Sequence, residues 1–247
     1  MLEQLYISII VPVFNGKNYI KKCFDNLLKQ DFKKPYEIIV VDDGSTDESK
    51  KKIKAYSSNI IQFYSLPSNR GPAAARDLGL KKAKGEYIFF FDVDDHIEQN
   101  TLTLLYNVAK QNNSDMVFCD KKWIEEFKNQ RENIFIYPAD KNFENSELVQ
   151  IMKERFYDPI SFSIFGLTGR LIKRSIITEN NIFFEKKLRY LEDETFIWDI
   201  LGYIKNISYV RKQLYSYYVK PNTNTALSEG IHKGYPIENF KLVKTHI

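Results

Sequence analysis

The sequence is poor in the features that mark several large classes of protein. Its 247 residues include only two cysteines, Cys23 and Cys119, and no Cys/His group has zinc-ligand spacing, which excludes a disulfide scaffold or a zinc module. The longest apolar stretch near the N-terminus, Ile7–Phe14, is broken by Ser8 and Pro12 and is far shorter than the roughly 20 residues of a transmembrane helix. The formal net charge is only +4, from 36 basic and 32 acidic residues that are interspersed, which argues against a nucleic-acid partner. We therefore expect a soluble globular protein of a reducing compartment, the cytoplasm.

The first half of the chain contains a regular alternation of β-branched runs and amphipathic segments. Ile7–Val13 is typical of a strand buried on both faces, whereas Lys17–Gln30 repeats its apolar residues at helical spacing. The expected strands are Ile7–Val13, Glu37–Val41, Ile60–Tyr64, Glu86–Phe91 and Asp115–Cys119. The expected helices are Lys17–Gln30, a lysine-rich helix with a capping box of Ser45 and Glu48, Pro72–Ala83 and Thr101–Lys110. This order predicts an α/β fold with a mostly parallel central sheet flanked by helices.

The regular alternation is lost after about Lys121. Residues 145–157 and 193–205 have helical patterns, Ile207–Val210 and Tyr215–Val219 resemble strands, and the tail from Pro221 has no clear period. We therefore divide the chain into residues 1–119, residues 120–220 and a C-terminal tail, 221–247.

Polar residues stand where three of the expected strands end. They are Asn15 after the first strand, Asp42 and Asp43 after the second, and Asp92, Asp94 and Asp95 after the fourth. Ligands of open α/β sheets bind beyond the carboxyl ends of the strands. Carboxylates this close repel each other unless a cation neutralises them, and oxygen ligands without His or Cys suit Mg²⁺ or Mn²⁺. The last cluster therefore predicts a divalent-metal site, with a solvated acidic turn before the helix at Thr101 as the alternative.

Two common phosphate-binding loops are missing. No Gly-x-Gly-x-x-Gly follows the first strand, and no Gly-x-x-x-x-Gly-Lys-Ser/Thr occurs anywhere. A dinucleotide oxidoreductase and a P-loop nucleotidase are therefore both disfavoured. A metal that bridges the diphosphate would do the work that a glycine loop does in those proteins.

Four segments resemble, in order and spacing, the family-2 inverting glycosyltransferases with the A-type (GT-A, Rossmann-like) fold. They are IIVPVFNGKNYIKKCFDNLLKQ, EIIVVDDGSTDES, NRGPAAARDLGLKKAKGEYIFFFDVDD and LEDETF, and the resemblance covers residues 6–219. It implies transfer of a sugar from a nucleotide diphosphate to an acceptor hydroxyl with inversion at the anomeric carbon. It also implies a nucleotide-sugar-binding half at 1–119 and an acceptor-binding half at 120–220 that contains the Glu-Asp motif.

The resemblance assigns the donor contacts. Pro12, Phe14 and Asn15 match the family's donor strand end, with Phe14 as a nucleoside contact. Asp42 and Asp43 match the next motif, in which Asp43 accepts a hydrogen bond from uracil N3–H. The N3 atom of cytosine is itself an acceptor, so a carboxylate would not form a hydrogen bond with it. Guanine and thymine also present a ring N–H, so Asp43 alone does not force the choice of uridine. The donor is therefore expected to be a UDP-sugar, a UDP-hexose or UDP-N-acetylhexosamine.

An arginine of the third segment completes the donor side. Arg76 matches a residue near the nucleotide and its diphosphate, with a surface helix arginine as the alternative. Asp77 stands where the family more often has Asn, so the local hydrogen bonding is expected to differ.

The family's metal motif matches Asp92, Val93, Asp94 and Asp95. Asp92 is expected toward the ribose or the metal, and Asp94 is the expected direct ligand. The cation, Mn²⁺ or Mg²⁺, would stabilise the leaving nucleotide diphosphate.

The Glu-Asp motif matches Glu192 and Asp193, and in the family its aspartate is the general base that takes the proton from the acceptor hydroxyl. Acidic residues also favour a helix N-terminus, and both roles can hold together. Members of this length build surface polysaccharide, lipid-linked oligosaccharide or protein glycans. The expected partner is thus a glycan, lipid-linked or protein-linked acceptor, and the enzyme can associate peripherally with the inner face of the membrane.

The remaining chemistry-bearing residues have plainer interpretations. His96 is expected to be a turn residue, with His232 a candidate remote metal ligand, and Cys23, Cys119, Trp123 and Trp198 are expected to pack.

Two other functions compete with this interpretation. A haloacid-dehalogenase-type phosphatase also has Asp-x-Asp after an apolar strand. However, that motif normally belongs to the first strand of its sheet, and the Thr or Val expected two residues after the second Asp is His96 here. A catalytically inactive glycan-assembly module would have lost the metal carboxylates or the Glu-Asp pair, and both are present.

Overall fold

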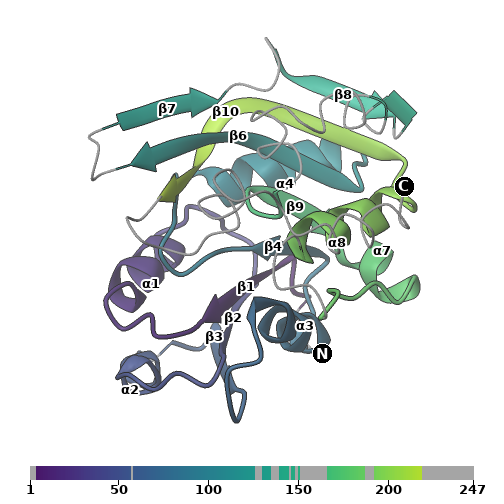
Figure 1. Ribbon diagram of the computed structural model, residues 1–247. Coiled ribbons are helices and arrows are strands. Elements are labelled where there is room, and N and C mark those ends of the chain that lie inside the picture. The colour runs from purple at the N-terminus through teal and green to yellow at the C-terminus, as the bar shows by residue number, and fades with distance from the viewer. Residues whose placement is uncertain are drawn as a thin grey trace.

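One mixed sheet organises the described part of the chain. The computed structural model describes residues 4–56, 58–125, 130–134, 139–144, 146, 147, 150, 166–186 and 192–218. The strands follow the order β3-β2-β1-β4-β9-β6-β10-β5, with β7 beside β6 and β8 beside β10 (Figure 1). The strands are β1 Ile7–Val13, β2 Tyr36–Asp42, β3 Ile61–Ser65, β4 Tyr87–Phe90, β5 His96–Ile97, β6 Met116–Glu125, β7 Gln130–Ile134, β8 Lys141–Glu144, β9 Arg170–Lys173 and β10 Asn206–Tyr218. The helices are α1 Ile20–Leu28, α2 Ser49–Lys54, α3 Pro72–Lys82, α4 Thr101–Gln111, α7 Arg174–Glu179 and α8 Glu192–Leu201.

The N-terminal strands confirm the predicted α/β pattern. β1 lies between β2 and β4 and is parallel to both, with Ile9 paired to Ile38 and to Phe89. Both faces of this strand are covered, which explains its nearly continuous apolar sequence. The carboxyl ends of β1, β2 and β4 therefore meet at one edge of the sheet.

The middle of the sheet departs from the sequence-based expectation. β9 enters between β4 and β6 and is antiparallel to both. The two short strands expected after residue 206 are one long strand, β10, whose pairing with β6 shifts register between Val210 and Tyr215. Arg211 and Lys212 are exposed at this irregularity, and they interrupt the apolar pattern that the sequence analysis relied on. The helical pattern at 145–157 falls largely outside the described residues.

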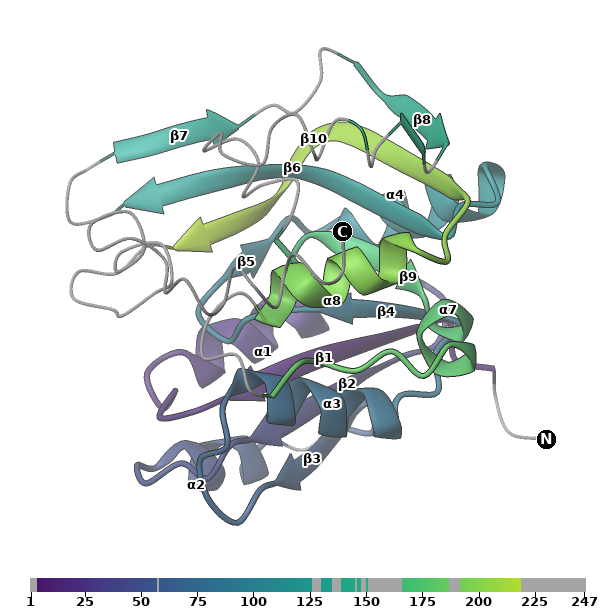
Figure 2. The same cartoon turned by 45° about the vertical axis from the view of Figure 1, so that its right-hand side comes forward.

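Helices cover the sheet on two sides and enclose two hydrophobic cores (Figure 2). One core joins the sheet to α3, α7 and α8 through buried residues such as Ala75, Ile177 and Phe196. The other joins it to α1, α2 and α4 through residues such as Phe24, Ile53 and Leu105. Because α3 and α8 share a layer, the N-terminal residues of α8 come close to the donor side of the sheet.

Gly79 allows α3 to approach β1 closely. A Cβ at this position would lie 2.4 Å from Cγ2 of Ile10, whose side chain is fully buried. Overpacking a core costs about 1–3 kcal/mol, and alanine's better helix propensity recovers at most about 1 kcal/mol. We expect Gly79→Ala to lower the free energy of unfolding by about 1–2 kcal/mol in urea denaturation. An unchanged midpoint would mean that β1 and α3 separate without cost.

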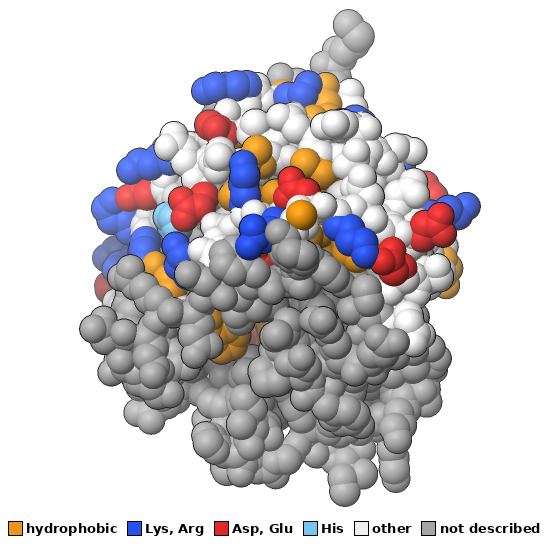
Figure 3. Space-filling view, turned by 90° about the horizontal axis from the view of Figure 1, so that it is seen from above, with side chains coloured by type: hydrophobic (Ala, Val, Ile, Leu, Met, Phe, Trp, Pro, Cys, Tyr) orange, Lys and Arg blue, Asp and Glu red, His pale blue; other side chains and the backbone are white. Residues whose placement is uncertain are grey.

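Among the described side chains on the face seen in Figure 3, basic and acidic residues are interspersed. Within the described residues, no helix combines the length and the apolar character needed to cross a bilayer.

Candidate active site

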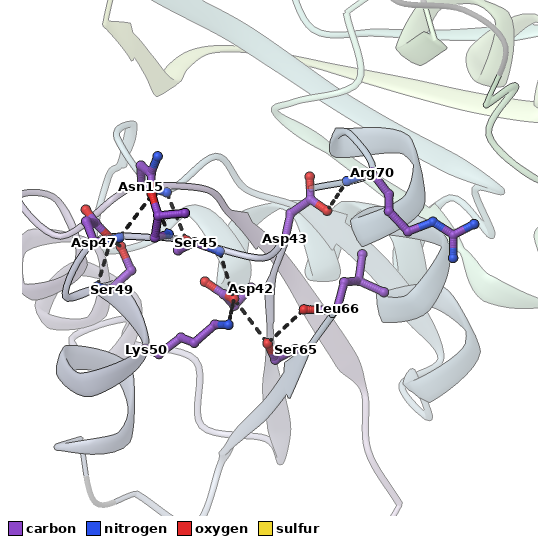
Figure 4. Close-up of polar contacts among 11 residues, drawn as sticks. Asn15, Asp42, Asp43, Ser45, Asp47, Ser49, Lys50, Ser65, Leu66 and Arg70 are labelled. Carbon is purple, nitrogen blue, oxygen red and sulfur yellow. Dashed lines mark hydrogen bonds and ion pairs between the residues drawn. The ribbon is translucent and has the colours of Figure 1, made fainter. Parts of the chain in front are cut away.

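Asn15 organises the loop that follows β2. Its backbone has φ 49°, a left-handed conformation that asparagine tolerates better than most residues. Its backbone N–H donates to Oγ of Ser45 at 2.9 Å, and its side-chain Oδ1 accepts from the backbone N–H groups of Thr46 at 2.9 Å and Asp47 at 3.3 Å (Figure 4). Asn15 therefore shapes the loop that closes one side of the strand ends.

The predicted capping box of Ser45 and Glu48 is wrong. Ser45 serves Asn15 instead, and α2 begins at Ser49, whose backbone N–H donates to Oδ1 of Asp47 at 2.9 Å. The short side chain of Asp47 accepts a hydrogen bond from the backbone N–H two residues further on. This local hydrogen bond takes the place of the predicted capping box.

Asp42 and Asp43 point to different sides of the end of β2 (Figure 4). Asp42 is fully buried; its Oδ2 accepts from the backbone N–H of Ser45 and the hydroxyl of Ser65, and lies 3.5 Å from Nζ of Lys50. This pattern is structural, and it matches the turn-forming alternative for Asp42.

Asp43 faces the start of α3. Its two carboxylate oxygens accept from the backbone N–H groups of Arg70 and Gly71, both at 2.8 Å. Gly71 has φ 87°, a conformation that favours glycine, so Asp43 fixes the turn that leads into α3. A carboxylate has about four lone-pair sites, so these two bonds leave Asp43 able to accept a further N–H.

The end of β1 presents an apolar surface at this edge. Pro12 is half-buried and pairs with Val41 of β2. On the other side of β1, the pairing with β4 ends at Ile10, so the N–H that proline lacks is not needed there as a hydrogen-bond donor. Phe14 is 47% exposed, which is unusual for so large an apolar ring. Because Val13 pairs with Asp42, Phe14 and Asp43 follow neighbouring strand ends, and an exposed ring there offers a stacking surface for a planar base.

The acidic segment after β4 contains two kinds of carboxylate. Asp92 and Asp94 are partly exposed, as is Val93. Asp95 is 2% exposed, and it accepts from the hydroxyl of Tyr215 at 2.5 Å and from the backbone N–H of Tyr218 at 3.1 Å. Burial, together with Asp92 and Asp94, raises the pKa of Asp95 well above its ordinary value. Asp95 thus anchors the segment to β10, whereas Asp92 and Asp94 remain toward the solvent side.

Among the described residues, no group of three or more His, Cys, Asp or Glu side chains has the geometry of a complete metal site. His96 is half-buried in β5, where it pairs with Ser216, and burial lowers its pKa. The expected turn residue therefore lies in a short strand. His232 lies outside the described residues.

Arg76 joins the two carboxylate groups of the site. Its Nη2 lies 3.2 Å from Asp92 and its Nη1 lies 3.0 Å from Glu192, and the side chain is 9% exposed. Burial opposes its charge, but Asp92, Glu192 and Asp193 outweigh burial and raise its pKa. Arg76 is therefore a permanent cation between the end of β4 and the start of α8.

Asp77 connects α3 to the segment that precedes α8. Its Oδ1 accepts from the backbone N–H of Phe184 at 3.1 Å, and its Oδ2 lies 3.0 Å from Nζ of Lys186. The ring of Phe184 stacks on Phe196 of α8 with centroids 3.9 Å apart. An aspartate here has an ion-pair partner that an asparagine would lack, which explains the departure from the family pattern.

Three acidic residues open α8. Burial and the Asp193 carboxylate raise the pKa of Glu192 to about 7, against the lowering effect of Arg76. Burial, together with the carboxylates of Asp193 and Glu192, raises the pKa of Glu194 to about 8. Asp193 is the most exposed of the three, and its Oδ1 accepts from the backbone N–H of Glu194 at 3.1 Å. It is therefore the carboxylate best placed to meet a ligand.

Tyr215 was not predicted from the sequence as a site residue. Its hydroxyl accepts from the backbone N–H of Asp92 at 3.4 Å and donates to Asp95. A tyrosine in an apolar strand pattern carries no local signal of this role. Cys23, Cys119 and Trp198 are buried, as predicted, and Trp123 is half-buried.

Comparison with known proteins identifies the class that this fold and site define. The Glycosyl transferase family 2 description matches residues 8–180, and the chain belongs to this family. It is 33% identical, over 87% of its length, to the poly(ribitol-phosphate) beta-glucosyltransferase of Bacillus spizizenii, covering 32% of that protein. It is also 33% identical to the poly(ribitol-phosphate) beta-N-acetylglucosaminyltransferase TarP of Staphylococcus aureus, of which it covers 63%.

Solved structures support the predicted GT-A fold. The crystal structure of S. aureus TarS 1–349 with UDP matches with a TM-score of 0.73 at 26% identity, over 88% of this chain and 61% of that one. The same protein with UDP-GlcNAc matches with a TM-score of 0.78 at 23% identity, over 98% and 66% of the two chains. The chain thus spans between about a third and two thirds of the relatives that it matches.

Proposed function

We propose that this chain catalyses transfer of a sugar from a UDP-sugar to an acceptor hydroxyl, with inversion, in the synthesis of a cell-surface or related glycan. The observation that carries the proposal is the Arg76 guanidinium between Asp92 and Glu192, which puts the donor carboxylates and the Glu-Asp motif in one site. Residues 1–119 would supply the donor contacts, and residues 120–220 the base and the acceptor contacts. The names of the relatives, which are glucosyl- and N-acetylglucosaminyltransferases, support this class of reaction.

The donor end of the site suits a uridine nucleotide. Asp43 has acceptor capacity left for the N3–H of uracil, and the exposed ring of Phe14 lies at the neighbouring strand end. The complexes of TarS with UDP and with UDP-GlcNAc support the same donor class.

Asp92 and Asp94 suit a divalent cation. Mg²⁺ is usually held by one or two carboxylates and by substrate phosphates, and a pair of partly exposed carboxylates fits that requirement without a complete protein cage. Mn²⁺ or Mg²⁺ bound there would stabilise negative charge on the departing diphosphate. The Pyrobaculum calidifontis mannosyltransferase was crystallised with Mn²⁺, although its 17% identity supports only the fold.

Asp193 would act as the general base. Displacement at the anomeric carbon needs one group to remove the acceptor proton while the leaving group is stabilised on the opposite side, and no covalent intermediate is required. Asp193 is more exposed than Glu192 and Glu194, which supports its access to an acceptor hydroxyl. Arg76 would keep Glu192 oriented beside it.

The direct test is a panel of UDP-sugars scored for UDP release with and without Mn²⁺ or Mg²⁺. Release from at least one UDP-sugar, dependent on the metal, is expected. Cleavage of a generic phosphate ester with no release of UDP would favour the phosphatase alternative.

Donor selection gives a second prediction. Because Asp43 would accept a ring N–H and the N3 of cytosine carries no hydrogen, UDP should raise the melting temperature more than CDP at equal Mn²⁺ concentration. Equal stabilisation by CDP would remove the uridine assignment, and GDP serves as a comparison because guanine also presents a ring N–H.

A further inference from the structure

The ammonium group of Lys121, in β6, is buried, and within the described residues it forms no close ion pair, although Asp193 and Asp95 favour its charge from a longer range. The residue is 6% exposed, and within the described residues the only hydrogen bond of Nζ is to the Thr168 hydroxyl at 3.2 Å. An ammonium has three donors, so two are left over. A buried charge without a partner is costly, and such an arrangement makes sense where an anion arrives from outside the protein.

Two half-buried aromatic rings continue the same face of the sheet. Lys121 pairs with Tyr215 across β6 and β10, and Trp123 pairs with Tyr217 two residues further along. The rings of Trp123 and Tyr217 lie 4.9 Å apart. We call Lys121, Trp123 and Tyr217 the β6–β10 strip.

The strip is close enough to the acidic segment after β4 and to Asp193 at the start of α8 for their charges to affect its side chains. Tyr215, the partner of Lys121, donates its hydroxyl to Asp95. Burial raises the pKa of Tyr217, and Asp92, Asp94, Asp95 and Asp193 add to this rise. Burial and Arg170 lower the pKa of Lys121 to about 8, whereas Asp193 and Asp95 act in the opposite direction. The electrostatic field of both groups therefore acts on the strip.

We propose that the β6–β10 strip is an acceptor subsite for a polyol or sugar that carries an anionic group such as phosphate. Lys121 binds the anion, and the rings of Trp123 and Tyr217 contact the carbon skeleton beside it. This inference rests on the proposed function. The donor diphosphate is assigned elsewhere, to the cation at Asp92 and Asp94, so the anion bound by Lys121 belongs to the acceptor.

The test uses the full chain saturated with UDP and Mn²⁺, titrated with glycerol 3-phosphate and, separately, with glycerol. We expect binding of glycerol 3-phosphate but not of glycerol, and a loss of about 10-fold or more in Lys121→Met, since a hydrogen bond to a charged group contributes about 1.5–3 kcal/mol. Lys122→Met is the matched control, because Lys122 is the next residue of the strand and points to the other face. It should bind like the parent.

Several results would overturn the inference. They are no binding by the parent, equal binding by Lys121→Met, an equal loss in Lys122→Met, or displacement of UDP by glycerol 3-phosphate, which would assign Lys121 to the donor phosphates.

Thermal stability separates a binding role from a structural one. Removing a buried charge that has no close ion-pair partner among the described residues should leave the melting temperature of Lys121→Met unchanged or higher, whereas loss of a structural contact would lower it. UDP release with water as the acceptor should be retained in this variant. Absence of that release in the parent would count against the proposed function and not against the binding role of Lys121.

Discussion

Replacement of Asp193 by Asn is expected to reduce sugar transfer by about 10²–10⁴-fold, the range that general-base catalysis typically contributes. Asn has nearly the same shape and can still accept the hydrogen bond from the Glu194 N–H, so the fold and the start of α8 should be retained. It cannot take a proton from the acceptor. Turnover and UDP-sugar affinity, measured side by side, should show a large loss in the first and little change in the second.

A matched variant makes this result specific. Glu179→Gln removes an exposed carboxylate from α7, away from the strand ends, and should leave turnover near that of the parent. Parental turnover in Asp193→Asn would move the base elsewhere, with Glu192→Gln the next variant to measure. A large fall in melting temperature would instead show that the Glu-Asp pair mainly stabilises the helix.

The second large effect concerns Asp94. Asp94→Ala should lower metal-dependent transfer by about 100-fold or more, because a bound cation contributes several kcal/mol to a charged transition state. The residual activity should respond little to EDTA, whereas the parent should lose its activity and recover it on addition of Mn²⁺. The measurement is UDP release across a titration of Mn²⁺.

Glu98→Ala is the control for Asp94→Ala, because Glu98 is an exposed carboxylate just beyond β5. If Asp94→Ala kept the metal response of the parent, the acidic segment would be a structural turn, the alternative interpretation of the sequence.

The N-terminal part of the fold was predictable because each strand there carries its own apolar signal. β1 is confirmed with its predicted bounds, and α3 begins at Pro72 as the preference of proline for a first helical turn indicates. β9 was not predicted, because Arg170–Lys173 has only two apolar residues and its strand character comes from its neighbours β4 and β6. The second half depends on such long-range pairing, which a local pattern does not contain.

The candidate site could be predicted as a list of residues but not as a set of contacts. The sequence analysis predicted Arg76 near a diphosphate. The structure shows its guanidinium between Asp92 and Glu192, and Glu192 lies 116 residues further along the chain than Arg76. The sequence analysis grouped Asp95 with Asp92 and Asp94, and the structure gives both oxygens of Asp95 to β10. Whether a carboxylate faces a ligand or a neighbouring strand depends on tertiary packing. The amino-acid sequence of the motif is the same in both cases, so the sequence alone does not distinguish them.

The position of β9 also constrains the order in which the chain can fold. β4 and β6 are made first, but the strand that joins them, Arg170–Lys173, emerges from the ribosome about 50 residues after β6 begins. Until then both strands keep an unpaired edge, and an unpaired edge is a template for aggregation. A fragment that stops after β6 would retain these two open edges. The nascent N-terminal half therefore depends on later residues, and a piece of this chain must extend through β10, which pairs with β6 and β5, to complete the described sheet.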